Sequence, residues 1–247
     1  MAKIISVVSG KGGTGKSTVS AGLGLSLAKM QYSVLMVDLD IGLRSLDILL
    51  GLENKIVFDI GDIIENKCKM SDAITKHKTY SALCLLCAPM SITKSFTVSK
   101  VIELIDSLKK EYDYIILDLP AGLGLSVIVA EALTDLLCIV TSPDVVTLRD
   151  SRKICDVLSQ NSDQECKVII NRVSKTALKT SDVKDLDEVM DMVGAPLLGV
   201  VREDQWIVSN LGLTNNPKKA TNEMQKTFHA IAKRITGEYV PLVVTTV

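Results

Sequence analysis

One segment near the N-terminus constrains the fold of this chain more than any other. Gly10, four residues and then Gly15-Lys16-Ser17 match the spacing of a loop that binds phosphate groups. An apolar, β-branched run at residues 4–8 precedes the loop, and a helical pattern of apolar residues follows it as far as Met30. A buried strand, a glycine-rich loop and a helix form the context in which this motif holds a nucleoside triphosphate, so we expect an α/β fold.

The residue types in the loop suit a triphosphate for separate reasons. Glycines permit positive φ and let the backbone N–H groups approach phosphate oxygens closely. A helix that begins near Gly15 adds its free N–H groups and the positive end of its dipole. Lys16 is expected to reach the β- and γ-phosphates, and the Ser17 hydroxyl to bind Mg²⁺. The alternative is a glycine-rich turn that contains a lysine by chance, which the flanking strand and helix disfavour.

Composition limits the other classes of function. A length of 247 residues with 47% hydrophobic residues suits one large α/β domain with a sizeable core. Aromatic residues make up only 4%, which argues against a platform that stacks nucleic-acid bases. The net charge of −1 provides no overall basic field, so the composition carries no strong nucleic-acid signal.

The hydropathy pattern indicates a cytoplasmic protein. The apolar runs have the length of strands, far short of the ~20 residues of a membrane-spanning helix. The apolar run at residues 4–8 leads straight into the glycine loop and is too short for a signal peptide. The six cysteines are therefore expected to be reduced. Cys84 and Cys87 lie three apart in a predicted strand, face opposite sides and are read as core residues rather than metal ligands.

Aspartates end two of the predicted buried strands. Residues 33–40 carry Asp38 and Asp40 at their end, and Tyr114–Asp118 ends in Asp118. Functional groups gather at the carboxyl ends of strands in doubly wound folds. These carboxylates therefore suit the Mg²⁺ shell and the positioning of water, with an ordinary polar strand end as the alternative.

Three segments resemble one known family. The first segment is the glycine-rich loop, which has the form Lys-Gly-Gly-x-Gly-Lys-Ser and begins with an early lysine, Lys11. The second is Asp38–Asp47, and the third is Asp-Leu-Pro-Ala-Gly at residues 118–122. Together they resemble the MinD/ParA family of P-loop ATPases, whose Walker A loop is deviant. The resemblance runs from Lys3 to about Glu238. It implies an α/β fold with a mostly parallel, twisted sheet of about seven or eight strands and helices on both faces. Residues 1–237 are expected to form a single ATPase domain, followed by an apolar tail at 238–247.

The resemblance also assigns roles to residues. Lys11 reaches across a dimer to the ATP of the partner subunit, although a solvated charge near an anion is the plainer reading. Asp40 orients the attacking water, and Gly122 brings a backbone N–H to the γ-phosphate. The implied catalytic residues are Lys11, Lys16, Asp40 and Asp118, and the implied metal residues are Ser17, Asp38, Asp40 and Asp118. The implied nucleotide-binding residues are Gly10, Lys11, Gly12, Gly13, Thr14, Gly15, Lys16, Ser17, Thr18, Asn171 and Arg172.

Asn171 ends the predicted strand Lys167–Arg172. In the family an asparagine at this place bonds the purine base, and an amide both donates and accepts as a purine edge requires. A capping or turn role for Asn171 is the alternative. Arg202 stands where relatives have proline, which puts the detail of base contact in question.

The family resemblance implies an Mg²⁺-dependent ATPase that acts as an ATP-dimerised switch in placing the division septum. Its implied partners are a second copy, a MinC-like protein and an activator, with peripheral contact at the inner face of the plasma membrane. The C-terminal tail, however, has no Lys or Arg, contains Pro241 and does not fit an interfacial helix. The alternatives are a flagellar-number regulator, a ParA-type DNA partitioner and, less favoured by the cysteine positions, an iron–sulfur carrier ATPase.

Overall fold

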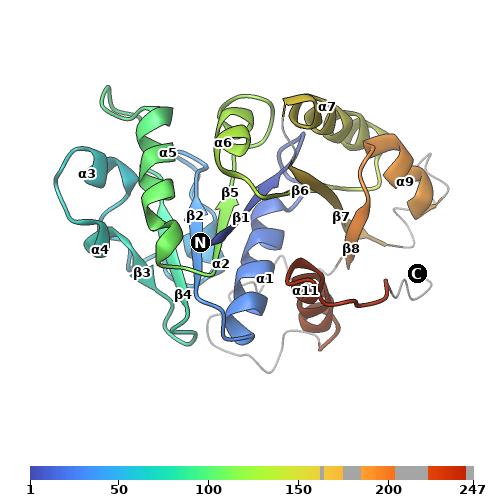
Figure 1. The fold of residues 1–247 in the computed structure, drawn as a ribbon, viewed down its shortest axis with the longest axis horizontal. Helices are drawn as coiled ribbons and strands as arrows, with labels where there is room; N and C mark the ends of the chain where they lie inside the picture. The colour runs from blue at the N-terminus through green and yellow to red at the C-terminus, as the bar shows by residue number, and fades with distance from the viewer. Residues whose placement is uncertain (162–163, 175–184, 204–221, 243–247) are drawn as a thin grey trace.

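The computed structural model describes residues 1–161, 164–174, 185–203 and 222–242 of the chain. Figure 1 shows one twisted sheet with helices packed on both sides. The sheet has eight strands in the order β3-β4-β2-β5-β1-β6-β7-β8. All neighbouring strands are parallel except the β3/β4 pair. The strands are β1 (Lys3–Val8), β2 (Val34–Asp38), β3 (Thr75–Lys76), β4 (Leu83–Cys87), β5 (Tyr114–Asp118), β6 (Leu136–Thr141), β7 (Glu165–Val173) and β8 (Leu197–Arg202).

The helices bury two apolar cores, one on each face of the sheet. The first face is covered by α3 (Ile60–Ile64), α4 (Met70–Ala73), α5 (Val98–Ser107), α6 (Leu125–Leu133), α7 (Val145–Asn161) and α9 (Leu186–Val193). The second is covered by α1 (Lys16–Lys29), α2 (Leu46–Leu49) and α11 (Asn222–Ile235). A 3-10 turn, η1 (Leu108–Lys110), extends α5. The α/β class, the parallel sheet and the helices on both faces are thus confirmed.

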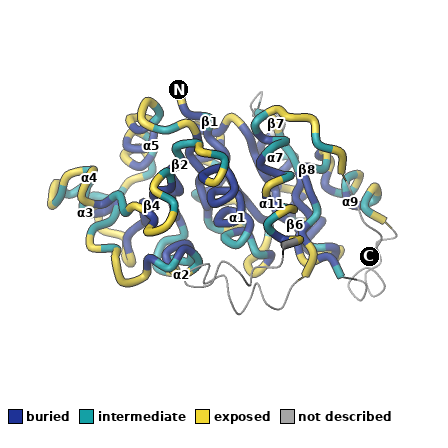
Figure 2. The backbone as a smooth tube through the Cα atoms, turned by 90° about the horizontal axis from the view of Figure 1, so that it is seen from below, coloured by how far each residue is buried: buried dark blue, intermediate teal, exposed yellow. Residues whose placement is uncertain are grey.

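The strands form because their residues are apolar on both sides. Every residue of β2, β4, β5 and β6 is buried, as expected for parallel strands that helices cover on both faces. Figure 2 shows the buried strands and α1 in dark blue at the centre, with exposed segments around them. Because the central strands are buried along their whole length, their ends are held in place by the packed core.

Some boundaries differ from those that the sequence predicts. The sequence predicts a helix over residues 43–51, but α2 is only one turn long, because Asp38 holds the preceding segment in a loop, as described below. The two-residue strand β3 pairs antiparallel with β4 and was not predicted, since so short a strand leaves no hydrophobic alternation. The sequence predicts a helix over residues 183–192; residues 183 and 184 lie outside the described part, and α9 begins at Leu186 with Asp185 as its N-cap.

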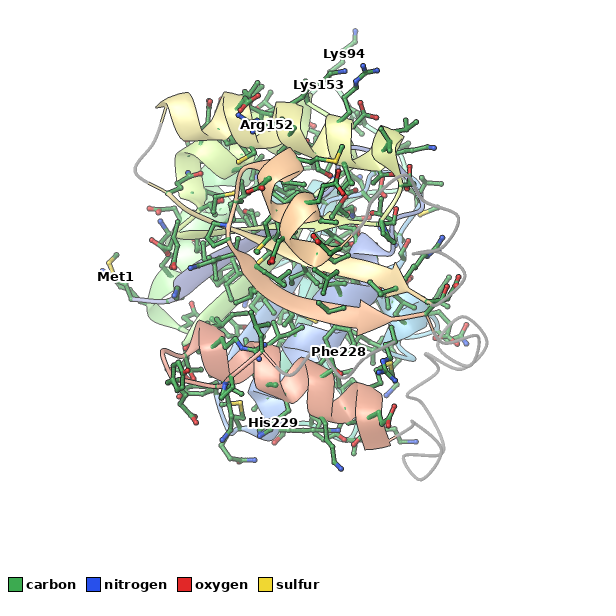
Figure 3. The ribbon with its side chains drawn as sticks, turned by 90° about the vertical axis from the view of Figure 1, so that its right-hand side faces the viewer. Met1, Lys94, Arg152, Lys153, Phe228 and His229 are labelled. Atoms are coloured by element: carbon green, nitrogen blue, oxygen red, sulfur yellow. The ribbon has the colours of Figure 1, made fainter. Side chains whose placement is uncertain are left out.

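Close packing of α1 explains its two internal glycines. A Cβ on Gly22 would lie 2.6 Å from the ring of Phe228 in α11, and one on Gly24 would lie 2.4 Å from the sulfur of Met36 in β2. Figure 3 shows Phe228 on the side of α11 that faces the rest of the molecule, with His229 on the outer side. These two glycines therefore let α1 pack closely against α11 and β2.

Cys84 and Cys87 belong to the cores on opposite faces of the sheet, so they do not form a joint metal site. No group of three or more His, Cys, Asp or Glu side chains suited to a metal ion occurs among the described residues. Among the same residues, no helix is long and apolar enough to cross a membrane. At the C-terminal end, Arg234 donates to the carbonyls of Val240 and Pro241 and holds the start of the tail; residues 243–247 lie outside the description.

Candidate functional site

The candidate site lies where β1, β2 and β5 end. These strands are neighbours in the sheet, and the parallel register places Asp38 of β2 beside Asp118 of β5. The glycine-rich loop at residues 9–15, here called the P-loop, leaves β1 at the same edge and leads into α1. Segments that are distant in sequence are thus brought together as predicted.

The P-loop ends in an open helix N-terminus. Gly13 and Gly15 have φ values of 83° and 86°, a conformation that favours glycine. Gly15 caps α1 without a side-chain hydrogen bond, and the first turn contains no acidic residue. A Cβ on Gly12 or Gly13 would meet no atom within 4 Å. One side of the loop is therefore open, and the N–H groups and dipole of α1 favour an anion there.

The other side of the P-loop is closely packed. A Cβ on Gly10 would lie 2.5 Å from the backbone carbon of Asp150 in α7. A Cβ on Gly15 would lie 2.2 Å from Nδ2 of Asn171, which donates to the carbonyl of Thr14 over 2.7 Å. The loop is therefore held from behind by α7 and by the end of β7.

Lys16 and Asp118 form a buried ion pair. The Lys16 Nζ lies 2.8 Å from Oδ1 of Asp118, and their side chains are 7% and 0% exposed. Ser20, one helical turn after Lys16, donates to the same Oδ1 over 2.9 Å. The other oxygen of Asp118, Oδ2, is buried and has no hydrogen-bond partner. A buried carboxylate oxygen left without a partner is costly, so Oδ2 of Asp118 is available as a ligand position.

The carboxylate of Asp38 accepts hydrogen bonds from the backbone in this structure. Its Oδ1 accepts from the N–H of Asp40, and its Oδ2 accepts from the N–H groups of Ser45 and Leu46. Burial, followed by the neighbouring charge of Asp118, raises the pKa of Asp38 to about 6. These bonds fold residues 40–46 into a loop, whereas a metal role for Asp38 stays a prediction.

Arg44 holds the same loop from its other end. Its guanidinium donates to the carbonyl of Ala88 and pairs with Asp59, which caps α3. Sequence reasoning did not identify Arg44 or Ser20. Ser20 has a recognisable signal, since it lies four residues after Lys16 on the same face of α1, whereas Arg44 has none.

Two predicted residues lie at the exposed rim of the site. Asp40 follows β2 and is partly exposed, and Lys11 is exposed at the tip of the P-loop. Lys11 is one of the charges that act on Asp144, at the start of α7. Because Lys11 extends from the surface, its geometry is compatible with reaching a second molecule.

Two further predictions concern Gly122, as a contact to phosphate, and Asn171 with Arg172, as contacts to the base. Gly122 has the positive φ expected of it, 92°, but its N–H donates to the carbonyl of Ser9 and so is not free for a phosphate. Asn171 lies against the P-loop and is 4% exposed, while Arg172 is exposed and has a positive φ of 58°. Base contacts by Asn171 and Arg172 stay predictions.

Comparison with known proteins gives one consistent result. A family model described as "ParA: NUBPL iron-transfer P-loop NTPase" matches residues 1–236. The septum site-determining protein MinD of Bacillus subtilis (strain 168) is 37% identical over 249 residues, covering 98% of this chain and 92% of that protein. MinD of Helicobacter pylori is 36% identical, covering 98% and 94%. The chain belongs to the ParA family and, within it, to the MinD proteins.

Solved MinD structures share the fold described here. The MinC:MinD cell division protein complex of Aquifex aeolicus aligns with a TM-score of 0.86 at 32% identity and covers 98% of both chains. MinD of Pyrococcus horikoshii complexed with Mg-ADP aligns with a TM-score of 0.82 at 30% identity, covering 95% and 96%. Like its family, the chain is a P-loop ATPase that uses ATP and Mg²⁺.

The MinD-type site fits this cofactor set on its own geometry. The open side of the P-loop has room at Gly12 and Gly13, and the N-terminus of α1 favours phosphate. Thr14 Oγ1 and Asp118 Oδ2 are buried atoms without partners in the described structure. Hard oxygen ligands such as Asp118 and Ser17 are those that Mg²⁺ prefers.

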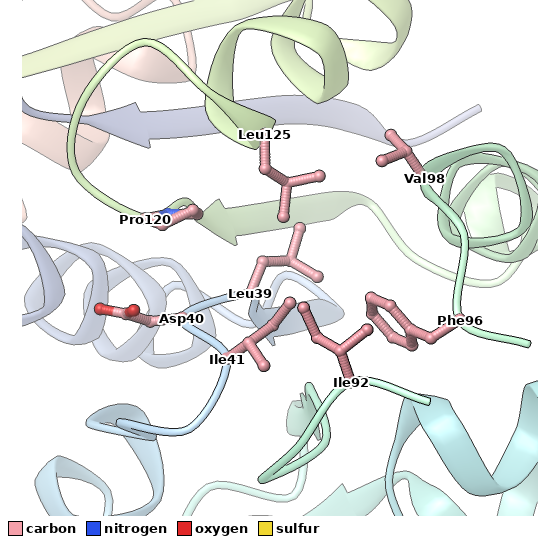
Figure 4. A pocket seen from close by; sticks show the side chains of 8 residues that line it. All are labelled: Leu39, Asp40, Ile41, Ile92, Phe96, Val98, Pro120 and Leu125. Atoms are coloured by element: carbon pink, nitrogen blue, oxygen red, sulfur yellow. The ribbon is translucent and has the colours of Figure 1, made fainter. Parts of the chain in front are cut away.

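An apolar pocket of about 380 Å³ adjoins the site. It is lined by Leu39, Asp40, Ile41, Ile92, Phe96, Val98, Pro120 and Leu125. Figure 4 shows the apolar side chains converging, while the carboxylate of Asp40 points away from them. Asp40 is thus the one charged residue among the described residues that line the pocket.

The contact at Gly10 gives a testable prediction about stability. A Gly10→Ala variant is expected to lower the free energy of unfolding by about 1–3 kcal/mol, because the new methyl group meets the backbone of Asp150. A Gly12→Ala variant, with no atom within 4 Å of its Cβ, is expected to stay within about 0.5 kcal/mol of the wild type. Urea unfolding without nucleotide measures both, and equal stabilities would contradict the packing of α7 on the P-loop.

Proposed function

We propose that this chain is an ATP-dimerised switch that takes part in placing the division septum. The observation that supports this most directly is the nearly full-length match to MinD of Bacillus subtilis, together with a P-loop that carries the exposed Lys11. The proposal includes a MinC-like partner, since the aligned Aquifex aeolicus structure is a MinC:MinD cell division protein complex. An activator protein and a cytoplasmic location with peripheral membrane contact belong to the same proposal.

The proposed reaction is hydrolysis of the γ-phosphate of ATP by water. Residues 10–18 bind the phosphates through backbone N–H groups, with Asn171 and Arg172 beside the base. Lys16, and Lys11 of the second subunit, neutralise charge that develops on the phosphoryl oxygens. Asp40 orients the attacking water. Ser17 and Asp118 would bind Mg²⁺, and Asp38 and Asp40 would lie near the water shell of the metal. When bound, Mg²⁺ would neutralise negative charge on the phosphates.

Binding of nucleotide requires a rearrangement of the pair described above. In the described conformation the Lys16 Nζ is paired with Asp118. The proposed reaction, however, needs the Lys16 Nζ at the phosphates. The Ser20 hydroxyl, which donates to Oδ1 of Asp118, would keep this carboxylate oriented when Lys16 leaves, while Oδ2 would stay available to a ligand. An exchange of partners at Asp118 is thus the proposed link between nucleotide binding and the loops that follow β2 and β5.

The iron–sulfur carrier alternative is less well supported. All six cysteines lie in described residues, and none is exposed. A cluster shared between two subunits needs cysteines at the surface where they meet. The absence of visible-range absorbance from a cluster in anaerobically purified protein would be consistent with this reading, and a cluster spectrum would reverse it.

Sedimentation with anionic lipid vesicles tests the proposed function. We expect the protein to be monomeric with ADP and dimeric with ATP, and to pellet with vesicles only in the ATP state. A protein that dimerises with ATP but never pellets would contradict the membrane part of the proposal. ATP-dependent, salt-sensitive binding to DNA would instead favour a ParA-type partitioner.

A further inference from the structure

Two cysteines outside the nucleotide site face each other across one core. Cys155 comes from α7 and Cys166 from β7, and their sulfur atoms are 3.9 Å apart. Cys155 is 5% exposed, and Cys166 is partly exposed. A disulfide needs the sulfurs to approach to about 2 Å, so formation of the bond requires the two side chains to move closer together.

The other cysteines do not compete for this pair. Cys138 lies on β6, beside β7, but belongs to the core on the opposite face of the sheet. Cys84 and Cys87 lie on β4, which is separated from β7 by four strands, and Cys68 packs beyond them near α3. Each thiol of the pair therefore has one cysteine partner; the Cys155 thiol also donates to the carbonyl of Gly194 over 3.6 Å.

The surroundings favour reaction at Cys155. The hydrogen bond with the Cys166 thiol lowers the pKa of Cys155, although burial works in the other direction. The thiolate is the reactive form, so Cys155 is the expected nucleophile and Cys166 the resolving thiol.

We propose that Cys155 and Cys166 form a reversible disulfide when the protein meets hydrogen peroxide. The Cys155 thiolate attacks one peroxide oxygen, the O–O bond breaks, and the other oxygen leaves as hydroxide, which becomes water on protonation. Cys166 then attacks the sulfenic sulfur, the S–S bond forms, and the sulfenic oxygen leaves as a second water with the Cys166 proton. The two thiols lose two electrons and the peroxide gains them. A dithiol reverses the reaction by exchange.

The bond would act on the P-loop through α7. Cys155 lies five residues after Asp150, whose backbone packs against Gly10. A disulfide anchors α7 to β7 close to this contact, so it is expected to change how α7 supports the loop. Such couplings have a typical size of 0.5–2 kcal/mol, which corresponds to an about two- to thirtyfold change in nucleotide affinity.

Peptide mass spectrometry tests the bond directly. Residues 154–167 contain both cysteines and no internal Lys or Arg, so trypsin releases them as one peptide. After treatment of the full chain with a small excess of hydrogen peroxide, this peptide is expected to lose two hydrogens and to resist alkylation until dithiothreitol is added. A Cys138→Ser variant is expected to behave identically. A wild-type peptide that is still alkylated at both cysteines, or a bond from Cys155 to another cysteine, would overturn the proposal.

A binding measurement tests the coupling to the P-loop separately. The apparent Kd for a fluorescent ADP analogue is compared in reduced and oxidised wild type and in a Cys166→Ser variant given the same treatment. We expect a change of at least about twofold in the wild type alone, reversed by dithiothreitol. Equal affinities in the two wild-type forms would leave the bond in place but refute its effect on the P-loop.

Discussion

A Lys16→Ala variant is expected to hydrolyse ATP at least about a hundredfold more slowly than the wild type, because it lacks a positive charge at the developing phosphoryl oxygens. The backbone of the P-loop stays able to contact phosphate, since its glycines and the N-terminus of α1 are unchanged. Phosphate release at saturating Mg-ATP measures the loss. Turnover at the wild-type rate would contradict the assignment of Lys16.

The same substitution is expected to destabilise the nucleotide-free protein. Lys16 is paired with Asp118, which is completely buried and has Asp38 as its register neighbour. Breaking a buried pair by removing one partner typically costs about 3–5 kcal/mol, because the remaining charge is left uncompensated. Urea unfolding without nucleotide is the measurement, and an unchanged free energy of unfolding would mean that the pair does not form in solution.

A double variant separates the two effects. Lys16→Ala/Asp118→Asn removes both charges, so it is expected to recover part of the lost stability but none of the lost turnover. If the double variant were less stable than Lys16→Ala alone, the uncompensated charge of Asp118 would not be the cause of the destabilisation.

The order of elements around the site was predictable because each left a local signal. The β-branched run of β1, the glycine spacing and the apolar periodicity of α1 are all encoded within the first 30 residues. Strands β2 and β5 are continuous apolar runs that end in aspartate, and parallel sheets bring such ends together. Thus, the placement of Asp38 and Asp118 near the P-loop followed from the pattern.

The contacts between side chains could not be predicted in the same way. Lys16 and Asp118 are 102 positions apart, and no periodicity indicates which oxygen of the aspartate is paired. Asp38 has the residue type and the position at a strand end that are expected of a metal ligand. Its oxygens nevertheless accept three backbone hydrogen bonds from the loop that follows β2. The position of Asn171 against Thr14 likewise depends on how β7 lies beside the P-loop, which only tertiary packing decides.

A Lys11→Ala variant is expected to lose most ATP turnover while keeping the stability of the wild type. Lys11 is exposed, so its truncation removes no buried contact, and the free energy of unfolding is expected to change by less than about 0.5 kcal/mol. Lys16→Ala differs from it by losing stability as well. Phosphate release and urea unfolding on the two variants distinguish a lysine that acts at the surface from one that also holds the core.

Mixing two inactive variants decides whether Lys11 acts within its own subunit or across a dimer. Asp40→Ala lacks the residue proposed to orient water, and Lys11→Ala lacks the proposed bridging charge. In a mixed dimer, the site of the Lys11→Ala subunit has its own Asp40 and receives Lys11 from the other subunit. Random pairing at equal concentrations is therefore expected to restore about a quarter of the wild-type rate, since half of the dimers carry one complete site of two. A lysine that acts within its own subunit predicts no recovery at any ratio, because neither subunit then contains a complete set.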